Sequence, residues 1–82
     1  MNDTPAPPVR ALLIEDESLL LMLLEDVLPD MGYAVAGSAR SLDDAWSKID
    51  SVEFDVALVD VNLAGMESFP VVEALVARGI PV

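Results

Sequence analysis

Two groups of acidic residues follow short apolar stretches, and they are the residues in this sequence best suited to chemistry. Asp60 follows the apolar stretch 56–59, and the triplet Glu15, Asp16 and Glu17 follows the apolar stretch 10–14. In an open parallel α/β sheet, ligands bind at the carboxyl ends of the strands. If the two stretches are neighbouring parallel strands, their carboxylates meet at one edge of the sheet.

Close carboxylates define a narrow range of chemistry. They repel one another, so at least one has a raised pKa or the group recruits a cation. A ligand set made only of oxygen atoms suits Mg²⁺. A carboxylate beside the cation can then serve as nucleophile toward a phosphoryl group. This chemistry requires neither histidine nor cysteine, and the sequence contains neither.

Each acidic group also has a purely structural interpretation. Asp60 can open the turn after its strand, and residues 15–17 can place negative charge at the positive end of a helix dipole. The presence of acids at the ends of two predicted strands favours the site over these separate explanations.

The elements that must position the acids alternate along the chain. Strands are predicted at 10–14, 33–37 and 56–59, with the start of a fourth at 80–82. Helices are predicted from Glu17 or Ser18 to Gly32, from a capping Ser41 onward, and from a capping Ser68 to Gly79, with loops at 38–40 and 61–67. The pattern predicts an α/β fold with a flavodoxin-like, doubly wound parallel sheet, here incomplete, in which the first strand lies between the second and third.

Apolar spacing predicts which helix faces turn inward. The strand 56–59 is expected to be buried on both faces. The first helix is apolar nearly all round at its start, which predicts a neighbouring helix there or, as the alternative, a face that docks a partner. Trp46 is interpreted as a packing residue at a helix rim. The predicted inward positions are Leu20, Leu24, Val27, Leu28 and Met31 in the first helix, Leu42, Ala45, Trp46 and Ile49 in the second, and Val72, Leu75 and Val76 in the third.

Composition limits the class of protein. The chain has 82 residues, 54% of them hydrophobic, and a net charge of -11 with only four basic residues. That balance argues against nucleic-acid binding. The lack of cysteine fits a reducing, cytoplasmic compartment, and the longest apolar run, 19–24, is too short for membrane insertion. Residues 1–9 are predicted to form a disordered Pro-rich tail, and 10–82 a single partial domain.

The quoted motifs resemble a known family. The segment 12–17 (Leu-Leu-Ile-Glu-Asp-Glu) before an apolar helix, and the segment 55–63 with Gly65 beyond it, resemble the receiver domain of two-component response regulators over 10–82. The resemblance implies that Asp60 is the phosphoacceptor of a histidine-to-aspartate phosphorelay. It implies that Asp16 binds Mg²⁺ directly, that Glu15 does so through water, and that Asn62 offers its backbone carbonyl.

The same resemblance implies binding partners, and it also shows where this sequence differs from the family pattern. The phosphoryl donor would be a phosphohistidine on a sensor histidine kinase or phosphotransfer protein, and the chain would be a signalling domain, not an enzyme, with at most weak self-phosphorylation or dephosphorylation. Receivers continue with a Ser or Thr and a Lys that this chain, ending at Val82, does not reach, so a C-terminally truncated domain is expected. Self-association through the open edge of strand 56–59 and through the first helix is expected as well.

Two other functions are compatible with the sequence. The chain can be a non-catalytic interaction or dimerisation module, with a vestigial acidic pocket and an apolar first helix that binds a partner. A phosphohydrolase with an aspartyl nucleophile ranks lower, because Asn62 stands where a second acid would serve as general acid.

Overall fold

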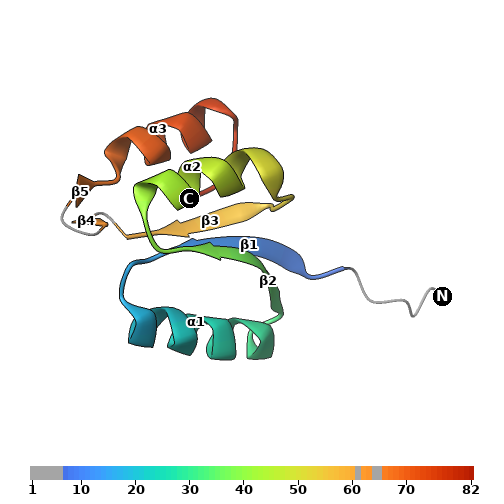
Figure 1. Cartoon of the computed structure of the whole chain (residues 1–82). Coiled ribbons are helices and arrows are strands. Elements are labelled where there is room, and N and C mark those ends of the chain that lie inside the picture. Colours follow the sequence, from blue (N-terminus) through green and yellow to red (C-terminus); the bar gives the residue numbers. More distant parts are fainter. Residues whose placement is uncertain (1–6, 61, 64–65) are drawn as a thin grey trace.

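The computed structural model describes residues 7–60, 62–63 and 66–82, and only the backbone of 62–63 and 66–67. Figure 1 shows a central sheet with helices on both faces. The elements in chain order are β1 (Val9–Ile14), α1 (Ser18–Asp30), β2 (Tyr33–Ala39), α2 (Leu42–Ser51), β3 (Val56–Val59), β4 (Asn62–Leu63), β5 (Met66–Glu67) and α3 (Phe69–Ala77).

The main sheet has the order β2-β1-β3, and both pairs of strands are parallel. The expected α/β class and the central position of the first strand are thus confirmed. Ile14, the last residue of β1, lies opposite Ala39 of β2 and Val59 of β3. The three strands therefore finish at the same edge of the sheet.

The central strand β1 supplies the core of both layers. Leu12 and Ile14 pack in the cluster beneath α2 and α3, whereas Ala11 and Leu13 pack in the cluster beneath α1. These four side chains are at most 1% exposed. Alternate side chains of a strand point to opposite faces, so an unbroken apolar run is what a strand covered on both sides requires.

The helix α1 is rotated relative to the face predicted from the sequence. Its buried residues are Leu21 and Leu28, with Leu24 partly buried between them. Leu20, Val27 and Met31 of the predicted face are exposed. Because residues 19–24 are all apolar, several phases satisfy the helical spacing, and only contact with the sheet selects one.

The strand β3 is less covered than predicted. Ala57 is fully buried beneath α2 and α3, but Leu58 is 38% exposed. The prediction that this strand is buried on both faces is therefore wrong at Leu58. The reason lies in the layers: on that face the cluster beneath α1 takes in residues of β1 and β2 but only Val56 of β3.

The helix α2 follows its predicted pattern. Its cap forms as predicted, since the Ser41 Oγ accepts a hydrogen bond from the Asp44 N–H at 3.1 Å. Ala45 and Ile49 are buried, and Trp46 remains 38% exposed at the rim.

The helix α3 differs from its prediction in one inward position. Leu75 is buried as predicted, but the other fully buried residue is Val71, while the predicted Val76 is 62% exposed. The helix ends before Gly79, whose positive φ of 74° explains the glycine there. Beyond it the predicted fourth strand is not formed as a strand, although the Ala57 N–H donates to the Pro81 carbonyl at 3.0 Å.

Several predicted boundaries shift. The strand β2 continues through Ser38 and Ala39, which were expected in a loop. The expected loop 61–67 contains β4 and β5, a short antiparallel pair, and Gly65 lies outside the described residues. Val9 belongs to β1 and not to the expected tail. Residues 1–6 lie outside the described residues, so the tail there stays a prediction. Among the described residues no helix has both the length and the apolar character needed to span a membrane.

An ion pair joins the beginnings of β1 and β3. The Arg10 guanidinium contacts both carboxylate oxygens of Asp55 at 3.2 Å, and the Arg10 N–H donates to the same carboxylate at 2.8 Å. Arg10 holds the pKa of the Asp55 carboxyl below its usual value. A lowered pKa means that this contribution to stability is present above the unfolded-state pKa of Asp55 and is lost as the pH falls through the folded-state value.

The orientation of α1 gives a direct prediction. We expect Leu21→Ala to lower the free energy of unfolding by about 2–4 kcal/mol, because it removes a buried side chain and leaves a cavity. Leu20→Ala removes the same atoms one residue earlier from a 38% exposed position and should cost about 1 kcal/mol or less. Urea denaturation of both variants measures the difference, and a larger loss from Leu20→Ala would contradict the observed orientation.

Candidate functional site

Backbone hydrogen bonds place Glu15 and Asp60 side by side. The Glu15 N–H donates to the Ala39 carbonyl at 2.9 Å, and the Asp60 N–H donates to the Ile14 carbonyl at 2.9 Å. Each acid thus lies one residue beyond its strand and still continues the pairing of the sheet. The positions of both side chains are set by the sheet register and not by a flexible loop.

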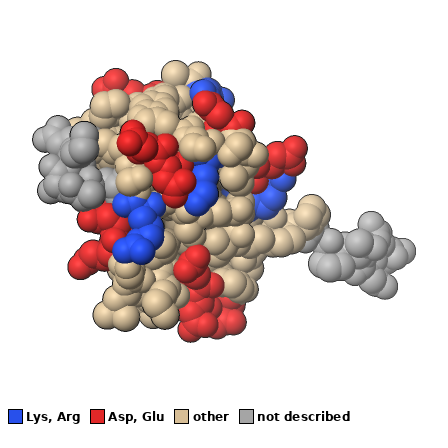
Figure 2. All heavy atoms as spheres, viewed as in Figure 1, with Lys and Arg blue, Asp and Glu red and all other residues tan. Residues whose placement is uncertain are grey.

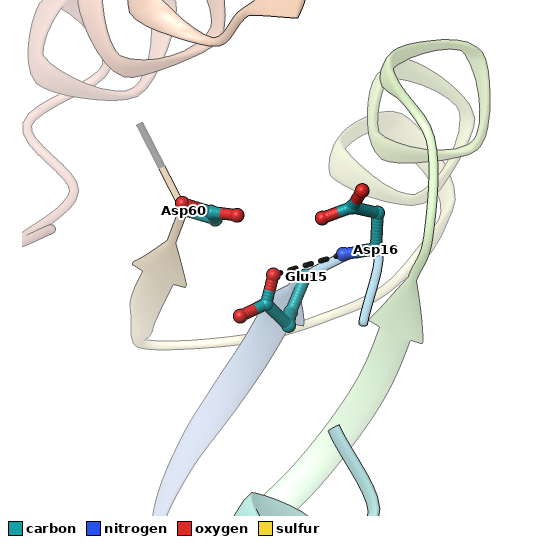
Figure 3. Close-up of side chains that lie close together, drawn as sticks. All are labelled: Glu15, Asp16 and Asp60. Atoms are coloured by element: carbon teal, nitrogen blue, oxygen red, sulfur yellow. Dashed lines mark hydrogen bonds between the residues drawn. The ribbon is translucent and has the colours of Figure 1, made fainter. Parts of the chain in front are cut away.

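Three of the predicted site residues come together. Carboxylate oxygens of Glu15, Asp16 and Asp60 all lie within 4.8 Å of one another, and Figure 3 shows the Glu15 and Asp16 carboxylates gathered near that of Asp60. Glu15 is buried, at 6% exposure, whereas the other two are partly exposed. The fourth predicted residue, Asn62, begins β4 two residues after Asp60, and its side chain is outside the description.

Glu15 is the electrostatically strained member of the group. Its burial raises the pKa of its carboxyl, and so do the hydrogen bond and the negative charge of Asp60. Backbone hydrogen bonds at Glu17 and Asp16 act in the opposite direction, and the one from the Asp16 N–H to the Glu15 Oε2 is 3.0 Å long. The net effect is an acid that holds its proton more tightly in the folded chain than in water.

Most of the basic residues form ion pairs elsewhere on the molecule. Three of the four pair with acids away from the site: Arg10 with Glu53 and Asp55, Lys48 with Asp44, and Arg78 with Asp50. Lys48 also donates to the Ser38 carbonyl. Figure 2 shows Asp and Glu spread over the visible face among few Lys and Arg.

The donor set fits a small divalent cation. All three side chains offer carboxylate oxygens, the ligands that Mg²⁺ and Ca²⁺ prefer. Opposite ligands around Mg²⁺ lie about 4.2 Å apart, twice the usual metal–oxygen distance. Three oxygens within 4.8 Å of one another are close enough to share one such cation, directly or through water. Buried Glu15, whose carboxylate already accepts from the Asp16 N–H, is suited to the indirect position.

A small hollow lies beside the carboxylates. It has a volume of about 230 Å³ and reaches from the site to the uncovered face of β3. Its lining residues are Ile14, Glu15, Leu24, Leu58, Val59 and Asp60. The site is thus open to small molecules on one side and apolar beneath.

Ser68 belongs to the site surroundings, although sequence reasoning assigned it only a capping role. It is fully buried, and its hydroxyl donates to the Asp60 carbonyl. It stands at the start of α3 as predicted, but its side chain makes no capping hydrogen bond. The sequence contained no signal for this contact, because a serine before Phe-Pro reads as an ordinary helix start.

Comparison with known proteins agrees with this geometry. The family model described as the response regulator receiver domain matches residues 11–82. The chain therefore belongs to the receiver domain family of response regulators, which are signalling domains of two-component systems.

Individual relatives show the same relationship. The chemotaxis protein CheY of Thermotoga maritima is 26% identical over 66 residues, which are 80% of this chain and 55% of CheY. The solution structure of SdrG from Sphingomonas melonis Fr1 superposes with a TM-score of 0.83 at 37% identity, over 94% of this chain and 66% of SdrG. The response regulator PhyR from Brucella abortus gives 0.82 at 34% identity, over 92% of this chain and 32% of PhyR. The chain thus spans about half the length of the curated relative CheY.

The crowding of carboxylates predicts that Glu15 destabilises the cation-free protein. We expect Glu15→Gln to raise the melting temperature at pH 7 in EDTA, because it removes a buried charge that Asp60 repels. A raised acid pKa costs stability as the pH rises from the unfolded-state value, 4.5, through the folded-state value. The gain should therefore shrink toward zero below that range, and thermal melts across pH measure it.

Glu73→Gln is the matched control. It removes the same charge from an exposed position within α3, away from the acidic site, so it reports the relief of general repulsion in a chain of net charge -11. An equal rise in melting temperature for both variants would show that crowding at the site contributes nothing.

Proposed function

We propose that the chain is a phosphoacceptor receiver module in which Asp60 takes a phosphoryl group with the help of Mg²⁺. The observation that carries the proposal is the convergence of three carboxylates within 4.8 Å at the carboxyl edge of the sheet. The raised pKa of Glu15 supports it, because such clustering is costly to stability and is typical of functional sites.

The transfer requires little beyond positioning. A carboxylate oxygen of Asp60 forms a bond to phosphorus while the bond from phosphorus to the donor's imidazole nitrogen breaks. The leaving imidazole keeps the electron pair and takes up a proton. Asp60 lines the hollow beside the site and is partly exposed, so its carboxylate is within reach of a donor.

The proposed cation site uses Asp16 and Asp60 as direct ligands, Glu15 through water, and the backbone carbonyl of Asn62. A bound Mg²⁺ supplies positive charge that offsets the carboxylates and the incoming phosphoryl oxygens. Glu15 must lose its proton to take part, so affinity for the cation should fall as the pH is lowered through its raised pKa.

The phosphoryl donor follows from membership of the family. We propose a phosphohistidine on a sensor histidine kinase or a histidine phosphotransfer protein. The negative net charge of the chain favours a partner with a basic surface.

Phosphorylation is tested by intact mass spectrometry after incubation with acetyl phosphate. We expect the mass of one phosphoryl group to be added in Mg²⁺ and much less in EDTA. Asp60→Asn should remain unmodified because it lacks the nucleophile.

Asp26→Asn is the control for that experiment, since it makes the same chemical change on the exposed face of α1. It should be modified like the parent. Modification of Asp60→Asn, or none of the parent, would contradict the assignment of Asp60.

A second candidate function rests on the outer face of α1. Leu19, Met22 and Leu23 are 81%, 64% and 56% exposed and line a shallow depression together with acidic residues. This surface supports the alternative of a protein-interaction module in which the acidic pocket is vestigial. Absence of both phosphorylation and Mg²⁺ binding, with partner binding retained, would favour it.

The same surface and the edge of β3 predict self-association. On the outer edge of β3 the described backbone makes the Ala57–Pro81 hydrogen bond, and strand edges with few such bonds pair readily with other chains. We expect multi-angle light scattering to show dimers or larger species at high concentration. The fraction should rise with salt, because salt screens the repulsion between chains of net charge -11.

Leu19→Glu with Leu23→Glu should shift the protein toward monomer if α1 contributes. A monomer at every concentration and salt level, with a cooperative melt, would contradict the prediction.

A further inference from the structure

Two serines stand at the starts of helices, and one hydroxyl accepts a hydrogen bond whereas the other donates one. The Ser41 Oγ accepts a hydrogen bond from the Asp44 N–H, the usual role of a serine at a helix start. The Ser68 hydroxyl instead donates backwards along the chain to the carbonyl of Asp60, eight residues earlier. Ser68 is also fully buried, so this contact is made out of reach of water.

With this contact, both the N–H and the carbonyl of Asp60 are hydrogen-bonded. On its amide side, the Asp60 N–H donates to the Ile14 carbonyl of β1. On its carbonyl side, Asp60 accepts from Ser68 at the start of α3. The main chain of Asp60 is therefore held by hydrogen bonds to β1 on one side and to the start of α3 on the other.

The same contact closes the connection between β3 and α3. Asp60 and Ser68 form its base, and within it Asn62 of β4 pairs with Glu67 of β5. The segment that includes Asn62 is thus constrained at its base and by its own backbone pairing. A connection closed in this way holds its backbone atoms in place at smaller entropic cost when they bind a ligand.

We propose that Ser68 is a positioning residue of the acidic site, whose hydroxyl holds the Asp60 main chain and the connection carrying Asn62 in the arrangement that binds the cation. The statement about the cation rests on the proposed function. Ser68 touches neither the cation nor the phosphoryl group. It acts through Asp60, as residues behind metal ligands do elsewhere.

A consequence is a link between the site and α3. If the Ser68 contact favours cation binding, then cation binding favours the contact by the same factor, since coupling free energies are reciprocal. The start of α3 should therefore become more rigid when the site is filled.

The test compares Ser68→Ala with Ser41→Ala in the full 82-residue chain. Mg²⁺ is titrated in while the amide chemical shifts of residues 14–17 are followed by NMR. We expect Ser68→Ala to weaken Mg²⁺ binding roughly 10-fold, the scale seen for residues that orient metal ligands. Ser41→Ala loses a helix cap and should melt lower, but it should bind Mg²⁺ like the parent.

Further variants isolate the hydroxyl. Ser68→Thr keeps it and Ser68→Val has the same shape without it, so Ser68→Thr should bind Mg²⁺ more tightly than Ser68→Val at this fully buried position. Ser68→Cys keeps the size of the side chain with a weaker donor and takes the place of Ser68→Ala if that variant does not fold. Equal affinity of Ser68→Thr and Ser68→Val would overturn the inference, because the hydroxyl would then be immaterial. Equal weakening by Ser68→Ala and Ser41→Ala would overturn it as well, since any loss of stability would then suffice.

Hydrogen exchange separates this inference from the proposed function. In EDTA, the amides of β4 and β5 should exchange faster in Ser68→Ala than in the parent. In Ser41→Ala their exchange rates should equal those of the parent. If the parent binds no Mg²⁺, the proposed cation site is contradicted. Faster exchange in Ser68→Ala alone would still establish that Ser68 holds the connection between β3 and α3. Unchanged exchange together with unchanged affinity would overturn the positioning role.

Discussion

The structure depends on the parallel hydrogen bonding of one strand to two neighbours. β1 pairs with β2 and β3 so that all three strands finish level at Ile14, Ala39 and Val59. The pairing continues one residue further at Glu15 and at Asp60, which brings two acids together that are far apart in the sequence. A register slip of one residue would turn the side chains of one strand to the opposite face and separate the two acids. At the other end, the Arg10 and Asp55 pair holds the same two strands together.

This arrangement works against stability at the edge where the strands finish. Glu15 is buried beside another acid, and the chain carries few cations, most of them paired elsewhere. The continuous apolar run of β1 offsets this loss of stability, because it fills the core on both faces of the sheet. A cation, or a proton on Glu15, relieves the remaining conflict. The acidic site is therefore a place where ligand binding and folding stability are coupled.

The sequence predicted what depends on pattern and missed what depends on contact. Strand order and the meeting of Glu15, Asp16 and Asp60 followed from alternating elements and from acids at strand ends. The orientation of α1 did not follow, because six consecutive apolar residues allow more than one buried face until the sheet selects Leu21 over Leu20. Ser68 was missed for a related reason. Its residue type and position predict a cap, and only the folded path of the connection brings the Asp60 carbonyl to its hydroxyl.

The contacts that build the site and the surfaces left uncovered are separate parts of the molecule. Gathering the carboxylates needs β1, which fills the core on both faces of the sheet, together with the end of β3 and the start of α3 on the face that α2 and α3 cover. On the opposite side, exposed apolar residues lie on the outer face of α1 and at Leu58 of β3. The hollow beside the site is where the two regions meet, since Leu58 and Asp60 both line it. A partner or second copy that covered Leu58 would therefore also change the solvent around Asp60, and chemistry at the site and association at the surface would be coupled through this hollow.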